Sequence, residues 1–377
     1  MKKEPAVRIL LGLLLAVLVK TSPAEAQSKQ APITGDIVIR HEWNNDLFAE
    51  PDPVPGSRTR FQMRPKFEID TKVLRMGLGA DINYSTDDNT KPKGIPLPLM
   101  LIRDNYDSRG IRLDIAYLGL RLSSALKIDA GRMVMPFRMT DMIWDKDLRI
   151  QGASGSLTIH QGSTGEPTAR VSGIYSRGSH VFIDSRDPEG SSTGEGVTIT
   201  GGSLDLGLGS GKRVDLSTSY LKFEKLSNLE TTIRRQNTRV AGALVREYEV
   251  IDATLRLRSD KPIPLQVILD GARNRKAPNQ KNGLWATLVL GSLRDSRFRG
   301  EYTYAKVDKD VTVAAYAGDD FFWGTGWRGH RAEIAFAQSP KASFHMIAQT
   351  QQFKDSPTLL ERNHWVKRFR LEARRSF

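Results

Sequence analysis

The chain has 377 residues, of which 39% are hydrophobic and 26% are charged, and its formal net charge is +13. The absence of cysteine excludes a disulfide scaffold and a thiol enzyme. The sequence pI is about 9.8, but neither a basic helix nor an aromatic stacking motif for nucleic acid accompanies that charge.

The first 26 residues have the pattern of a secretory signal peptide. Residues 2–8 carry positive charge, residues 9–19 form an apolar run, and Ala24 and Ala26 frame a cleavage position before Gln27. The apolar run is shorter than the roughly 20 residues of a spanning helix, which favours cleavage over an N-terminal anchor. Cleavage removes four basic and two acidic residues, so the net charge of +13 falls to +11 in residues 27–377, which we predict to be one domain.

Alternation of apolar and polar residues recurs through the rest of the chain, which is the period of a strand with one apolar and one polar face. The alternating segments are 33–40, 61–70, 74–84, 111–117, 214–220, 251–257, 298–304, 344–348 and the C-terminal stretch. Turn-rich stretches separate them at 51–56, 87–94, 184–196, 277–283 and 355–358. A charged face on every strand disfavours a soluble β-sandwich.

The sequence therefore predicts an all-β, closed antiparallel transmembrane β-barrel with polar residues inside. At roughly 20–22 residues per strand and connection, residues 27–377 predict about 16 strands, within a range of 14 to 18. Aromatic residues near the strand ends fit an interfacial girdle, although ordinary packing explains each of them equally well. They are Trp43, Phe48, Tyr106, Trp144, Trp285, Trp323, Trp327 and Trp365.

Residues 131–148 form the most distinctive segment, with the sequence GRMVMPFRMTDMIWDKDL. This stretch resembles the "putative porin" family of Gram-negative outer membranes, whose chains carry a similar G-R-x-x-x-P-F-x-x-T-D-x-x-W-D-x-D-L motif. A looser second similarity lies at residues 307–329, around the Ala-Ala pair at 314–315 and the residues 319–322. The resemblance implies a passive outer-membrane channel.

We expect residues 136–148 to fold inward as a constriction loop, because acidic and basic groups gathered in a narrow aqueous path screen solutes by charge and size. The residues assigned to this loop are Arg132, Pro136, Phe137, Arg138, Thr140, Asp141, Trp144, Asp145 and Asp147. An equally open alternative is a rigid loop whose aspartates cap turns. Calcium binding by the three aspartates is a third reading, disfavoured because the glycine-turn spacing of a calcium loop is missing.

Basic residues exceed acidic ones on the predicted inward faces. The candidate pore-lining residues are Arg64, Lys66, Arg112, Arg256, Arg258, Arg299, Arg368, Arg370 and Arg374. This excess predicts a mild anion preference. The rival explanation is that basic side chains on the outside bind anionic lipopolysaccharide, which would not affect permeation.

The C-terminal strand alternates Phe369 and Leu371 with charged residues and ends on Phe377. A terminal aromatic residue that closes such a strand resembles the assembly signal of bacterial outer-membrane barrels, although Arg375 stands where that signal prefers an apolar residue. The resemblance implies recognition by the barrel-assembly machinery.

The sequence predicts no enzyme and no cofactor. Its six histidines are scattered, and Gly-x-Ser-x-Gly, H-E-x-x-H, P-loop and dinucleotide-binding motifs are missing. The predicted function is an outer-membrane porin for small hydrophilic solutes and ions. The alternative is a plugged or gated barrel with a structural, export or hydrolytic role. The expected partners are outer-membrane lipid and lipopolysaccharide, permeating solutes, and further copies of the chain in a homotrimer by analogy with porins of similar size.

Overall fold

The computed structural model describes residues 33–45, 57–86, 110–161, 167–178, 197–208, 212–226, 237–240, 243–244, 247–318, 324–353 and 365–377. The predicted signal peptide and its cleavage position lie outside these residues. The same holds for the turn-rich stretches 51–56, 87–94, 184–196 and 355–358.

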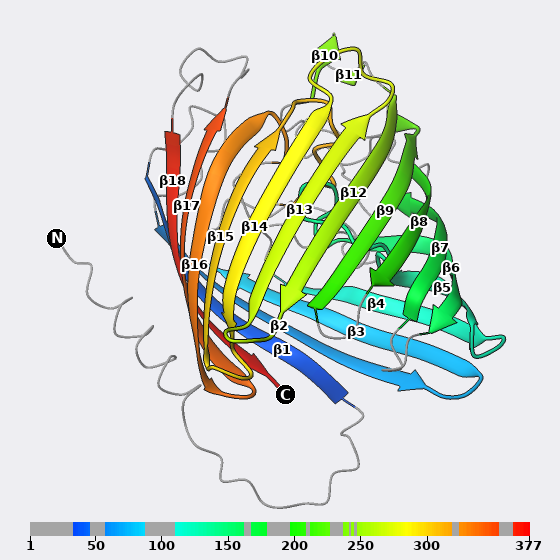
Figure 1. Cartoon of the computed structure of the whole chain (residues 1–377), viewed down its shortest axis with the longest axis horizontal. Helices are drawn as coiled ribbons and strands as arrows, with labels where there is room; N and C mark the ends of the chain where they lie inside the picture. The colour runs from blue at the N-terminus through cyan, green and yellow to red at the C-terminus, as the bar shows by residue number, and fades with distance from the viewer. Residues whose placement is uncertain are drawn as a thin grey trace, which may run out of the picture.

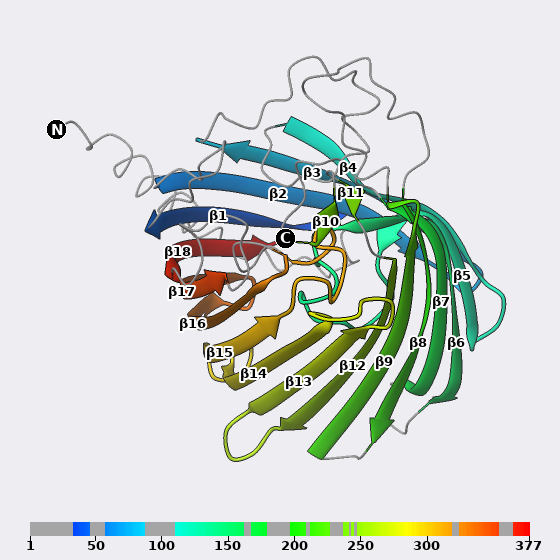
Figure 2. The same ribbon diagram turned by 90° about the horizontal axis from the view of Figure 1, so that it is seen from above.

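Sixteen of the described strands close into one antiparallel barrel, shown from two directions in Figures 1 and 2. Neighbouring strands follow one another along the chain, except that β9 pairs with β12. The barrel strands are β1 (Ile33–Asn45), β2 (Ser57–Asp70), β3 (Leu74–Ser85), β4 (Gly110–Arg121), β5 (Leu126–Val134), β6 (Arg149–Gln161), β7 (Pro167–Gly178), β8 (Thr198–Leu208), β9 (Lys212–Glu224), β12 (Tyr248–Ser259), β13 (Leu265–Asn274), β14 (Asn282–Ser292), β15 (Phe298–Val307), β16 (Trp327–Ser339), β17 (Ala342–Phe353) and β18 (Trp365–Ser376). Two short strands, β10 (Arg239–Val240) and β11 (Ala243–Leu244), pair outside the ring. The predicted fold class and strand number are confirmed.

The barrel closes where the last strand meets the first. β18 pairs with β1 along ten residue pairs, from Asp36 opposite Ser376 to Asn45 opposite Lys367. Beyond β18, the N–H of Phe377 donates to the carbonyl of Gly35 at 3.0 Å, and the N–H of Gly35 donates back at 3.2 Å. Phe369 and Leu371 point outward from this seam, 41% and 36% exposed.

The two faces of the wall have opposite character, as the alternation predicts. On β16, Arg331 and Glu333 are buried inside the barrel, whereas Ile334 and Phe336 are exposed on the outer surface. An apolar outer wall around a polar interior is the arrangement of a barrel that stands in lipid and holds water. In the part of the chain that the structure describes, no helix is long and apolar enough to cross a membrane.

The alternation predicted for residues 111–117 is wrong for the last residues of that segment, which face the opposite side of the wall. The alternation of residues 111–117 places Ile111, Leu113, Ile115 and Tyr117 on one face. The register of β4 shifts opposite Gly79 and Ala80, which turns Ile115 and Tyr117 toward the interior. There the Tyr117 hydroxyl donates to Glu68 at 3.2 Å. A β-bulge inserts one extra residue and so reverses the side-chain alternation beyond it.

The two ends of the barrel differ in their connections. Short turns at residues 71–73, 122–125, 260–264, 293–297 and 340–341 lie at the end that also holds Ile33 and Phe377, which we call the turn end. Longer connections, which include residues 135–148, 275–281 and 308–318, lie at the opposite end, which we call the loop end. Long loops on one side and short turns on the other are typical of outer-membrane barrels.

Candidate functional site

The connection between β5 and β6 enters the interior of the barrel. The Thr140 hydroxyl donates to the carboxylate of Asp270 on β13, and Nη2 of Arg256 on β12 donates to the carbonyl of Arg138 at 3.4 Å. Residues 135–148, which we call the inner loop, therefore reach the wall formed by β12 and β13. Figure 2 shows this segment in teal within the ring of strands.

A second segment, residues 308–318 after β15, packs against the inner loop. Trp144 and Tyr316 stack with ring centroids 5.3 Å apart and an interplanar angle of 10°. The N–H of Asp145 donates to the carbonyl of Tyr316 at 2.8 Å, and the N–H of Gly318 donates to the carbonyl of Asp141 at 2.6 Å. These two segments are the ones that carry the family resemblance in the sequence, and nothing in the sequence predicts their contact.

The two segments build an apolar core inside the barrel. Met142, Ile143 and Trp144 are each at most 4% exposed, and Trp285 and Trp327 from the wall belong to the same cluster. Burial at this scale holds the inner loop in place, since each large apolar side chain contributes about 1.5–3 kcal/mol.

The expected aromatic girdle is correspondingly only partly present. Trp144, Trp285 and Trp327 lie inside the barrel, because the inward loops give them apolar partners there. Trp43 is 40% exposed on the outer surface, and Trp365 also faces outward. Phe48, Tyr106 and Trp323 lie outside the described residues.

The three aspartates of the inner loop have separate roles. Asp145 is 4% exposed, and its carboxylate accepts a hydrogen bond from the N–H of Asp147 at 2.7 Å. Asp145 therefore caps a turn, as expected for a rigid loop whose aspartates have structural roles. Asp141 lies 3.6 Å from Nζ of Lys146. Asp147 accepts a hydrogen bond from Nη1 of Arg64 on β2 at 2.5 Å, and so links the inner loop to the wall at β2.

The two arginines predicted to accompany these aspartates are placed as follows. Nε of Arg132 donates to the carbonyls of Leu113 and Asp114 on β4, at 3.0 Å each. Arg138 offers its own carbonyl to Arg256. The cation beside Asp147 is Arg64, which the sequence assigns to the pore lining but not to this loop.

The other residues of the predicted loop motif shape and anchor the start of the inner loop. Pro136 lies beside a cavity of the interior. Phe137 is 7% exposed and packs near Gly201 of β8, where a Cβ would lie 3.2 Å from its ring. Gly131, at the start of the motif, has φ +132° and leaves no room for a Cβ, which would lie 2.2 Å from the carbonyl oxygen of Ala116. A glycine is therefore required where β5 leads into the inner loop.

Two cavities meet at the Arg64–Asp147 ion pair. One has a volume of about 640 Å³ and the other about 560 Å³, and both are lined by Asp36, Arg64, Lys146 and Asp147. The larger also touches Arg40, Arg294, Lys341, Arg374 and Arg375. The smaller touches Lys66, Glu68, Arg75, Asp114, Lys127, Asp129, Arg149 and Arg170. Basic side chains outnumber carboxylates around each cavity.

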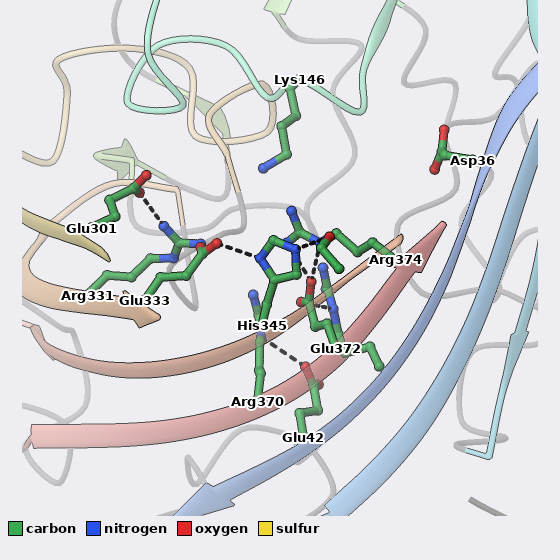
Figure 3. A network of polar contacts seen from close by, with 12 residues as sticks. Asp36, Glu42, Lys146, Glu301, Arg331, Glu333, His345, Arg370, Glu372 and Arg374 are labelled. Atoms are coloured by element: carbon green, nitrogen blue, oxygen red, sulfur yellow. Dashed lines mark hydrogen bonds and ion pairs between the residues drawn. The ribbon is translucent and has the colours of Figure 1, made fainter. Parts of the chain in front are cut away.

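Ion pairs cover the inner wall between β15 and β2. Arg331 bridges Glu301 and Glu333, Arg370 reaches Glu42 at 3.1 Å, and Arg374 reaches Glu372 at 2.5 Å. Figure 3 shows these contacts, with Lys146 of the inner loop extending toward them. Such charge-assisted hydrogen bonds fix the orientation of these side chains on the wall.

All nine candidate pore-lining residues lie on interior strand faces. Arg64 and Lys66 are on β2, Arg112 on β4, Arg256 and Arg258 on β12, Arg299 on β15, and Arg368, Arg370 and Arg374 on β18. Several carry a carboxylate partner: Lys66 pairs with Glu68 at 2.7 Å, and Arg299 pairs with Glu301. The net positive charge that a passing ion meets is therefore smaller than the number of basic residues alone would give.

A chain of hydrogen bonds on β16 and β17 corresponds to no motif of the sequence. Nε2 of His345 lies 2.8 Å from Oγ of Ser343, and Nδ1 of His345 lies 2.7 Å from Oε1 of Glu333. The only sequence signal for it is that Ser343 and His345, two residues apart on one strand, share a face. Their glutamate comes from the neighbouring strand.

The calcium reading has no support in the structure. Among the described residues, no group of three or more carboxylate, histidine or cysteine side chains is arranged to hold a metal ion. The loop aspartates are engaged by a main-chain N–H, by Lys146 and by Arg64.

The charge of Asp147 should persist into acid. Burial acts to raise the pKa of Asp147, but the positive charges of Arg64 and Lys146 outweigh it and hold the pKa below its ordinary value. The ion pair is therefore complete above the ordinary aspartate pKa of about 3.9 and is lost only as the pH falls through the lowered value. Asp147 should therefore stay charged from pH 7 to about pH 4. Over this range we expect the ionic currents of the wild type and of Asp147→Asn to depend on pH in the same way. Bilayer current recorded across this range for both proteins is the measurement, and a step near pH 5 that disappears in Asp147→Asn would contradict it.

Comparison with known proteins agrees with the geometry. Residues 41–183 match the family described as "Putative porin". A mutant of the porin of Rh. blastica shares the fold with 8% sequence identity and a TM-score of 0.50, over 92% of this chain and 99% of that chain. Salmonella typhi OmpF, in a complex with daunomycin, shares it with 10% identity and a TM-score of 0.53, over 92% of this chain and 97% of that chain.

Among curated proteins, no sequence matches the chain. The two solved structures carry information on the fold alone, and the family match covers β2–β7 with the inner loop between them. The chain is therefore a closed 16-stranded β-barrel with the fold of the porins, and its residues 41–183 match the family described as "Putative porin".

Proposed function

We propose that the protein is an outer-membrane channel through which small hydrophilic solutes and ions diffuse passively, with a mild preference for anions. The observation that carries this proposal is the Arg64–Asp147 ion pair, which joins the inner loop to β2 between two cavities of the interior. A charged contact at the narrow part of an aqueous path acts on every solute that passes it.

The preference for anions follows from the lining of those cavities. Lys146, Arg294 and Lys341 face the larger cavity, and the carboxylates there are Asp36 and Asp147, both of which contact Arg64. A channel with excess positive charge attracts anions and repels cations, and the effect weakens as salt screens the field. The preference is mild because much of the wall charge is paired.

The reversal potential in a salt gradient tests this selectivity. We expect a sign that reports anion preference for the wild type and a shift toward cations for Lys146→Gln, because Lys146 is 59% exposed and touches both cavities. Lys72→Gln is the matched control, since it removes the same charge from an exposed turn between β2 and β3. A wild type selective for cations would contradict the proposed preference.

Location and assembly complete the proposal. Residues 1–26 would direct export and be cleaved before Gln27, and the barrel-assembly machinery would recognise the strand that carries Phe369, Leu371 and Phe377. The mature protein would then stand in the outer membrane among lipopolysaccharide as a homotrimer. The N-terminal sequence of the protein from outer-membrane fractions tests the cleavage, and its mass in detergent tests the trimer.

Ester hydrolysis is a second candidate function, which the Ser343–His345–Glu333 chain favours. His345 could take the Ser343 proton while Glu333 orients the imidazole, and Ser343 lines the larger cavity. A fluorophosphonate probe tests it directly. Labelling of the wild type and not of Ser343→Ala would establish a reactive serine, whereas equal absence of labelling in both would remove this candidate.

A further inference from the structure

The outer surface of β15–β18 changes in character toward the loop end, as the strand register shows row by row. One row joins Gly300, Ile334, Met346 and Leu371, and the next joins Tyr302, Ala332, Ala348 and Phe369. The two rows closest to the loop end are polar: Tyr304, His330, Thr350 and Lys367, then Lys306, Arg328, Gln352 and Trp365. An apolar band thus gives way to aromatic residues and then to cations.

Side-chain contacts tie the cationic rows together. Nε of Arg328 donates to Oε1 of Gln352 at 2.7 Å, and the guanidinium lies 5.8 Å from the centre of the Trp365 ring. His330 shares a 2.7 Å hydrogen bond with the Tyr302 hydroxyl, and its ring lies 6.0 Å from that of Trp365. We call Lys306, Arg328 and Lys367, with His330 and Trp365 between them, the basic patch.

The three cations of the basic patch lie on β15, β16 and β18, with no carboxylate among the outward residues between them. Lys306 and Arg328 stand directly opposite on β15 and β16, where Cβ atoms are about 5 Å apart. No outward residue of the four rows is acidic, and within the described part of the chain none of the three cations forms an ion pair. Lys306 and Arg328 repel each other at this distance, so an anion bound between them would be stabilised, and Lys367 adds positive charge from two strands away.

We propose that the basic patch binds the phosphate groups of the phosphorylated glycolipid that forms the outer leaflet of the outer membrane. The inference rests on the proposed location of the barrel. Below the patch, the exposed Ile334 and Met346 face the acyl chains, and Tyr302 and Phe369 mark the interface. The cations then stand at the height of the headgroups, at the loop end, which faces outward in barrels of this kind.

The side chains of the patch suit a phosphate group attached to a sugar and acyl chains. Arg328 can offer two parallel N–H donors to one phosphate, and the flanking lysines add charge from either side. Trp365 and Tyr302 can pack against the sugar rings or the upper acyl chains while their polar atoms stay in the headgroup layer.

The test is a titration of fluorescently labelled bisphosphorylated lipid A into the full-length mature protein in detergent. The triple variant K306Q/R328Q/K367Q is expected to bind about a hundredfold more weakly than the wild type, the effect of removing three cations from a lipid surface. The matched control K72Q/K261Q/R297Q loses the same charge from turns at the opposite end and is expected to bind like the wild type. Shifts in gel mobility on heating show that all three proteins are folded barrels.

Two results would overturn the inference. One is equal binding of lipid A by the triple variant and the control. The other is wild-type binding of dephosphorylated lipid A, or of phosphatidylglycerol, as tight as that of bisphosphorylated lipid A. Because binding is measured in detergent, the outcome does not depend on conduction. A silent channel that binds lipid A would contradict the proposed function and leave this site in place.

Discussion

Replacing residues 138–147 by a short Gly–Ser linker is expected to raise the single-channel conductance severalfold. The segment carries the Thr140–Asp270 and Asp147–Arg64 contacts, which bring the inner loop against the walls at β13 and β2. Removing it joins the two cavities that now meet at the ion pair. Conductance in planar bilayers is the measurement, and an unchanged value for a folded variant would contradict a constriction at this place.

A second variant keeps the inner loop intact, because the deletion also uncovers Tyr316 and could disturb the apolar core. The chain contains no cysteine, so Asp147→Cys creates a single reactive thiol. A bulky thiol reagent is expected to reduce the current through Asp147→Cys strongly and to leave Lys72→Cys, in an exposed turn, unchanged. Full current through the modified Asp147→Cys protein would place the ion path elsewhere.

Glu42→Ala is expected to destabilise the barrel by about 3–5 kcal/mol, as when one partner of a buried ion pair is removed. The Glu42 side chain is fully buried at the closing seam, where it accepts hydrogen bonds from Arg58 of β2 and from Arg370 of β18 at 3.1 Å. Its loss leaves two guanidinium groups inside the wall without that carboxylate. Urea unfolding of the refolded protein in detergent, followed by tryptophan fluorescence, measures the change.

The matched control is an exposed ion pair on a single strand. Nζ of Lys222 and Oε1 of Glu224 lie 2.6 Å apart, with 40% and 45% of their side chains exposed. Exposed pairs contribute little, since water and salt screen both charges. We therefore expect Glu224→Ala to leave the unfolding midpoint unchanged, and similar losses in both variants would show that the seam has no special role.

The wall of the barrel could be predicted from the sequence because strand alternation is local. In β18, Arg368 and Arg370 alternate with Phe369 and Leu371, and the structure has each pair on the expected side. The reversal at Ile115 and Tyr117 could not be predicted, because the bulge depends on the pairing of β4 with β3.

The interior was harder to predict because its contacts join distant segments. Trp144 stacks on Tyr316, and Asp147 pairs with Arg64. In each case the two residues are far apart in the sequence, so neither local pattern nor spacing reveals the contact. The sequence does place acidic residues in the loop and arginines on the wall. Which pair meets, and that Asp145 caps a turn, follows only from the folded chain.

The most direct test of the account is the conductance of the refolded mature protein in a planar lipid bilayer. We expect stable, discrete current steps, because two cavities lined by charged side chains flank the inner loop at the Arg64–Asp147 pair, where we propose that solutes pass. A correctly folded barrel that gives no current would contradict the channel and indicate that the inner loop and residues 308–318 close the lumen.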